Sequence, residues 1–169
     1  MKVLFAANSS GLGHATRIIP LVYETLKKHD VYILSDFRAL DLLKSEFGSK
    51  IKQYFKLQDY SFQNKSFTNT RFSINRFLVN SPTYLKELRK EHVEFLKIQK
   101  KHKFNIIISD SRYGIHAPDS HSYIITNHLK ILVKGILRQT SGEATELANY
   151  FFMRHFNGII IPDYTNNGI

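Results

Sequence analysis

A histidine directly follows a glycine-rich loop near the N-terminus. The stretch SSGLGHATR places Gly11, Gly13 and His14 between an apolar run and a segment with helical periodicity. Backbone N–H groups at a helix N-terminus attract anions, and an imidazole titrates near neutral pH, as a general base must. At this point the pattern leaves three roles open for His14: a contact to a phosphate, a catalytic base, or a helix-capping residue.

Further polar residues stand where other predicted strands end. Asp110 ends the apolar run NIIISD, and Asn127 and His128 follow SYIIT. The carboxyl ends of parallel strands share one edge of a sheet, where ligands bind. A carboxylate at that edge could orient a catalytic imidazole, although Ser-Asp-Ser after a strand is also a helix-capping sequence. The candidates for substrate or phosphate contacts are Ser10, Gly11, Gly13, Arg17, Asn127 and His128, with Ser9 beside them.

Short apolar runs that alternate with helical patterns predict the fold. The predicted strands are 2–7, 30–36, 50–57, 103–110, 122–126 and 157–163, and the predicted helices are about 14–28 and 83–103. Runs such as NIIIS are continuously apolar, as expected for strands buried on both faces. The sequence therefore predicts an α/β fold: one Rossmann-like, doubly wound, mainly parallel sheet with helices on both faces. The predicted inward side chains are Ile18, Leu21, Val22, Thr25 and Leu26 in the first helix, and Tyr84, Leu85, Leu88, His92, Phe95 and Leu96 in the second.

The composition fits one basic domain. The 169 residues carry 24 Lys and Arg against 14 Asp and Glu, a formal charge of +10 at pH 7. This excess favours an anionic partner, and nucleic acid, a membrane face and phosphorylated substrates all qualify. The aromatic and basic segment 58–82 has no clean period, and its rings could be core, a platform for single-stranded nucleic acid or a membrane contact. With no signal peptide and no apolar run long enough to cross a membrane, we expect a cytoplasmic protein.

Two other kinds of site are disfavoured. The spacing of His116, His121 and His128 matches no helical ligand pair, so we expect no metal. A dinucleotide-binding loop would require a third glycine where Thr16 stands, although Asp36 lies near the ribose-binding position of that motif.

The loop SSGLGHATRIIPL resembles the first loop of GT-B-fold glycosyltransferases, a group that includes the bacterial peptidoglycan N-acetylglucosaminyltransferase and the UDP-glycosyltransferases. It is most similar to archaeal and bacterial predicted glycosyltransferases whose first strand is followed by G-x-G-H-x-x-R, here Gly11, Gly13, His14 and Arg17. NIIISDSRYG and SYIITNH resemble later strands and loops of the same set, so the resemblance extends to about Asp163.

This resemblance implies that residues 1–163 form the N-terminal, acceptor-side domain of an inverting glycosyltransferase, with 164–169 as a tail or the start of an interdomain connection. His14 would be the base and Asp110 its orienting carboxylate. The donor would be a nucleotide-diphosphate sugar, without cofactor or metal, and a C-terminal donor domain would act in cis or in trans.

The resemblance also makes a lipid-linked acceptor and an anionic membrane face candidate partners, with the chain peripheral on the inner membrane face. The alternatives are a stand-alone, non-catalytic anion- or nucleotide-binding module, and one half of a split two-chain enzyme. A dinucleotide-binding domain ranks third and a nucleic-acid module fourth.

Overall fold

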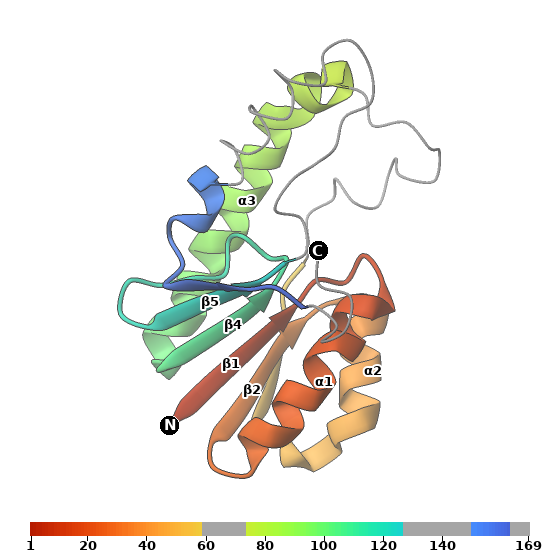
Figure 1. The fold of residues 1–169 in the computed structure, drawn as a ribbon, viewed down its shortest axis with the longest axis vertical. Coiled ribbons are helices and arrows are strands. Elements are labelled where there is room, and N and C mark those ends of the chain that lie inside the picture. Colours follow the sequence, from red (N-terminus) through yellow and green to blue (C-terminus); the bar gives the residue numbers. More distant parts are fainter. Residues whose placement is uncertain (59–73, 127–149, 163–169) are drawn as a thin grey trace.

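Six parallel strands form the centre of the protein in a computed structural model that describes residues 1–58, 74–126 and 150–162. The strands are β1 (Lys2–Ala7), β2 (Asp30–Ser35), β3 (Gln53–Lys56), β4 (Ile106–Asp110), β5 (His121–Ile125) and β6 (Gly158–Ile160). Their order in the sheet is β3-β2-β1-β4-β5-β6, and every neighbouring pair is parallel. The predicted doubly wound α/β architecture is confirmed, and the strand order reverses direction between β1 and β4 (Figure 1).

Helices cover both faces of the sheet (Figure 1). α1 (Leu12–Leu26) and α2 (Phe37–Phe47) lie on one face, and α3 (Ile74–His102) lies on the other. Alternate residues of β1 enter the two cores: Phe5 packs with Ile18 of α1, whereas Leu4 packs with Phe95 of α3. Burial on both sides explains why the strands are continuously apolar.

Several element boundaries differ from the predicted ones, and α2 has no counterpart among the predicted helices. α1 begins at Leu12 instead of residue 14, and a 3₁₀ turn, η1 (Gly48–Lys50), precedes the shorter β3. α3 begins at Ile74, within the segment predicted to be irregular, and continues through Pro82. A proline removes one helical donor and disfavours helix at the preceding residue, but it does not have to end the helix. The stretch 59–73 of that segment and the tail 163–169 lie outside the described residues.

The inward face of α3 is also rotated from the predicted one. Leu85 is exposed, while two polar residues, Glu91 and Gln99, are buried with Phe95 between them. Glu91 Oε1 accepts a hydrogen bond of 2.7 Å from Nε of Arg112, which is itself fully buried. Gln99 exchanges hydrogen bonds with the backbone N–H and C=O of Phe104. Polar partners thus make burial of this stripe favourable, which a count of apolar residues does not reveal.

Leu21 of α1 is likewise more exposed than predicted, whereas Ile18 and Val22 are buried as expected. Among the described helices, none has an apolar stretch sufficient to cross a lipid bilayer.

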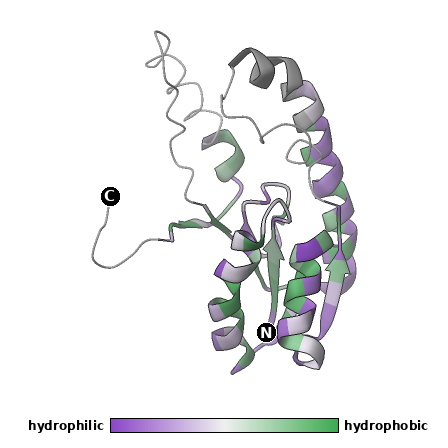
Figure 2. Cartoon of the chain, turned by 90° about the vertical axis from the view of Figure 1, so that its right-hand side faces the viewer, coloured by the Kyte–Doolittle hydropathy of each residue, from purple (hydrophilic) through white to green (hydrophobic). Residues whose placement is uncertain are grey.

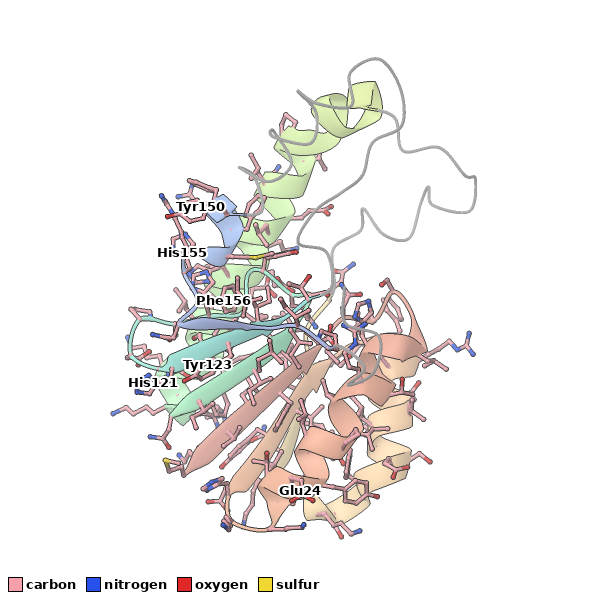
Figure 3. The ribbon with its side chains drawn as sticks, viewed as in Figure 1. Glu24, His121, Tyr123, Tyr150, His155 and Phe156 are labelled. Carbon is pink, nitrogen blue, oxygen red and sulfur yellow. The ribbon has the colours of Figure 1, made fainter. Side chains whose placement is uncertain are left out.

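Three histidines from separate segments stack on the α3 side of the sheet. The ring of His116 lies 4.3 Å from that of His92 of α3 and 4.9 Å from that of His155, measured between centroids. His155 stands between Tyr150 and β6, as Figure 3 shows. Burial, with smaller contributions from the charges of His92 and His155, lowers the pKa of His116 to about 4. The stack therefore links β6 to α3 as long as the central ring is neutral.

This arrangement predicts that acid weakens the fold. The unfolded chain binds a proton at residue 116 below its ordinary pKa of 6.5, and the folded chain does so only near 4. The free energy of unfolding should therefore decrease as pH falls from 6.5 to about 4, with no contribution from this group above that window. In His116→Phe, which keeps the stacking ring, this part of the slope should vanish in urea titrations at several pH values. An unchanged slope would contradict the assignment, and exposed His121→Asn is the matched control.

Candidate active site

The ends of β1 and β4 bring three predicted site residues together. Asp110 is the last residue of β4 and pairs in register with Ala7 on one side and Ile125 on the other. His14 and Arg17 lie in the first turns of α1, which follows β1 after a short loop. Because the strand order reverses between β1 and β4, these residues stand at the switch point of the sheet, where α/β proteins place their ligands.

One carboxylate oxygen of Asp110 contacts three side chains of the site. Asp110 Oδ1 lies 2.9 Å from Nδ1 of His14 and 3.3 Å from Nη1 of Arg17, and it accepts a 3.2 Å hydrogen bond from Oγ of Ser111. The Asp110 side chain is 0% exposed and that of His14 is 20% exposed. Three donors, one of them a guanidinium, offset the cost of burying this carboxylate.

The carboxylate also determines what the imidazole can do. An ionised carboxylate only accepts hydrogen bonds, so Nδ1 of His14 must carry the hydrogen of this pair. In the neutral ring Nε2 then keeps its lone pair and is able to accept a proton. Asp110 Oδ2 is buried and makes no hydrogen bond in the described part of the chain. The negative charge of the Asp110 carboxylate lies next to His14 Nδ1 and would stabilise the ring once it accepts a proton.

Asn8 also supports the site, although it is not among the residues predicted from the sequence. It is fully buried, its backbone N–H donates to the Asp110 carbonyl, and its side-chain Nδ2 donates to the Ser111 carbonyl. Its Oδ1 accepts from the N–H of Ser10 at 2.8 Å. Asn8 thus ties the glycine-rich loop to the end of β4. Its position directly after a buried strand was the available signal, because a buried amide must find partners.

Asp110 does not cap a helix. The residues after β4 form no helix as far as His121, and the carboxylate faces His14 and Arg17.

Ser111, the next residue, has a φ of 57°, in the left-handed region. A residue other than glycine pays about 1–2 kcal/mol for this conformation. Backbone strain of this kind concentrates at functional sites.

The two glycines of the loop have open space around them. A Cβ placed on Gly11 or Gly13 would meet no atom of the described residues within 4 Å, and neither glycine has a positive φ. The backbone conformation at these two positions therefore does not require glycine. No side chain caps α1, and its first turn holds no acidic residue. No acidic side chain of its own first turn therefore neutralises the positive end of α1.

A second polar cluster lies where β2 and β3 end. Asp36 is buried and caps α2 by accepting from the N–H of Phe37, and Lys56 Nζ lies 3.7 Å from its Oδ1. Phe37 has a φ of 43° and is 52% exposed, with Lys56 Nζ 5.7 Å from the centre of its ring. Asp36 is thus engaged within the fold, and the exposed, strained Phe37 was not foreseen from the sequence.

Two predicted site residues, Asn127 and His128, lie outside the described residues. In the described part of the chain, no group of three or more His, Asp or Glu side chains is placed to hold a metal ion.

The model of Glycosyl transferase family 1 matches residues 1–133. The chain belongs to this family. No curated protein sequence matches it.

Several glycosyltransferase structures share the fold of this family member. The calicheamicin glycosyltransferase CalG4 aligns with a TM-score of 0.53 over 89% of this chain and 42% of its own, at 13% identity. A Glycyrrhiza uralensis enzyme, UGT73P12 complexed with glycyrrhetinic acid 3-O-monoglucuronide, gives 0.54 over 97% of this chain and 44% of its own, at 13% identity. The spinosyn rhamnosyltransferase SpnG, complexed with thymidine diphosphate, gives 0.50 over 74% and 34%, at 12% identity. The chain therefore matches one half of GT-B glycosyltransferases and spans less than half of their length.

The open space at the loop predicts contrasting results for two glycines. Gly13→Ala should leave the free energy of unfolding unchanged or raise it by about 0.5–1 kcal/mol, because alanine favours helix and meets no neighbour. Gly48, whose φ is 49°, also has open space, so Gly48→Ala should cost about 1–2 kcal/mol through its backbone alone. Urea unfolding of both variants measures the difference. A destabilised Gly13→Ala would show that the space above α1 is filled.

Proposed function

We propose that this chain is the acceptor-binding, N-terminal domain of an inverting glycosyltransferase and that His14 is its catalytic base. The observation that carries the proposal is the 2.9 Å hydrogen bond between His14 Nδ1 and the buried Asp110. It gives the ring the tautomer of a base, at the edge of the sheet where a ligand would sit. Membership of Glycosyl transferase family 1 supplies the reaction class.

In this proposal, Nε2 of His14 removes the proton from an acceptor hydroxyl as its oxygen attacks the anomeric carbon of a nucleotide-diphosphate sugar. The new bond joins the acceptor oxygen to that carbon on the face opposite the leaving group, so the configuration inverts. The bond from the carbon to the diphosphate oxygen breaks, and the nucleoside diphosphate departs with the electron pair. Asp110 stabilises the imidazolium that forms, as the carboxylate does in other His–Asp pairs.

The donor would require a second half of the enzyme, in cis or in trans. The chain spans between 34% and 44% of the structural neighbours cited above. On the side described here, the uncapped start of α1 and the backbone of Gly11, Gly13 and Ser10 would face the diphosphate or the acceptor. Arg17 already donates to Asp110, so in this proposal it positions the carboxylate, and any phosphate contact would use its remaining N–H groups.

The open start of α1 also favours one alternative, a non-catalytic anion- or nucleotide-binding module. In that case the loop binds an anion and His14 transfers no proton. The two functions differ in what a substitution at residue 14 does, which an assay of turnover separates.

The test is sugar transfer by the polypeptide as encoded, including any residues beyond Ile169. Release of nucleoside diphosphate is measured with uridine- and thymidine-diphosphate sugars and a panel of hydroxyl acceptors. Loss of the base in His14→Ala should reduce kcat by roughly 10²–10⁴-fold, the usual contribution of general base catalysis. His29→Ala, in the turn after α1 and away from this edge, should keep wild-type turnover.

Undiminished turnover by His14→Ala would remove His14 as the base. A wild-type chain that binds nucleoside diphosphates but transfers no sugar would favour the non-catalytic alternative.

A further inference from the structure

The exposed charged residues on the outward face of α3 are all basic. Its exposed residues between positions 85 and 101 are Leu85, Lys86, Arg89, Lys90, Val93, Lys97, Lys100 and Lys101. The acidic residues of this stretch lie off that face: Glu91 is buried, and Glu87 and Glu94 are half-buried toward its border. Figure 2 shows hydrophilic colour along the outward side of the helix.

These charges form one continuous stripe. Lys86, Lys90, Lys97 and Lys101 follow helical spacings of four, seven and four, so they project from the same side of α3. At 1.5 Å per residue the stripe is roughly 22 Å long. None of its six basic side chains forms an ion pair in the described part of the chain.

Helix stability does not explain this arrangement. Like charges three and four residues apart, as at Lys86 and Lys90 or Lys97 and Lys101, disfavour a helix, and only Glu87 and Glu94 offset this within the stretch. The helix dipole favours basic residues only in the last turn, which accounts for Lys100 and Lys101 but not for Lys86, Lys90 or Lys97. An external anionic surface would supply the missing counter-charges.

We propose that this face of α3 docks on an anionic phospholipid surface. Val93 lies at the centre of the stripe and Leu85 at its rim, and each is 48% exposed. A row of cations around a small apolar centre suits lipid headgroups, where the charges meet phosphates and the apolar side chain enters the interface. The face holds no aromatic, Asn or Gln side chain for stacking on bases or bonding to their edges, which disfavours nucleic acid.

Docking by this face leaves the candidate active site uncovered. α3 packs on the sheet through Phe95 and the Glu91–Arg112 pair, so its basic stripe points away from the sheet. His14 belongs to α1, on the opposite face. The proposal is therefore independent of the glycosyltransferase mechanism, and either one can fail without the other.

The test is co-sedimentation of the full chain with vesicles of phosphatidylcholine alone and with vesicles that also contain phosphatidylglycerol. The chain should bind only the anionic vesicles, and salt should weaken binding. The variant Lys86→Gln/Lys90→Gln/Lys97→Gln should bind them roughly a hundredfold more weakly, since each basic side chain at an anionic leaflet contributes about a factor of five. Glutamine is a good helix former, so the fold should persist, as circular dichroism would check.

The matched control, Lys28→Gln/Lys44→Gln/Lys50→Gln, removes the same charge from exposed positions of the α1 and α2 side and should keep wild-type binding. Val93→Asn should weaken vesicle binding while leaving its salt dependence unchanged. Equal losses in both triple variants would overturn the proposal, because net charge alone would then explain binding. Tighter binding to a random single-stranded oligonucleotide than to the vesicles, lost in the α3 variant, would also overturn it in favour of nucleic acid.

Discussion

The buried carboxylate of Asp110 is the constraint around which the edge of the sheet is built. A fully buried charge is unfavourable unless it is paired, and here His14, Arg17 and Ser111 all donate to the same oxygen. Two of these donors come from α1, so the pairing fixes α1 against the end of β4. It also fixes the proton on Nδ1 of the imidazole. A structural requirement, the pairing of a buried charge, therefore produces the protonation state that a base needs.

Hydrogen bonds of Asn8 and Arg112 hold the end of β4, and with it this carboxylate, in place. Asn8 links the loop before α1 to the backbone of Asp110 and Ser111. Arg112, the next residue along, donates to Glu91 of α3 and to the carbonyl of Leu57, which follows β3. The loop that follows Asp110 is thereby tied to α3 and to the end of β3. Such anchoring sustains the positive φ of Ser111, which an isolated loop would relax.

The sequence alone was sufficient to predict the doubly wound α/β fold and the proximity of His14 and Asp110. Continuous apolar runs indicated a parallel sheet buried on both faces, and strand ends placed His14 and Asp110 at one edge. The partner of Arg17 was not predictable, because a guanidinium near a helix start is equally compatible with solvent, phosphate or carboxylate. The orientation of α3 was missed because Glu91 and Gln99 are buried through contacts with Arg112 and Phe104, which no local period encodes. The strain at Ser111 and Phe37 likewise arises from tertiary context.

The tautomer of His14 tests the central claim most directly. Heteronuclear NMR of protein labelled at the histidine ring nitrogens reports which nitrogen carries the hydrogen. For the neutral His14 ring, the account predicts a hydrogen on Nδ1 and none on Nε2, and a mixture of tautomers in Asp110→Asn. A wild-type ring protonated at Nε2, with Nδ1 unprotonated, would contradict it.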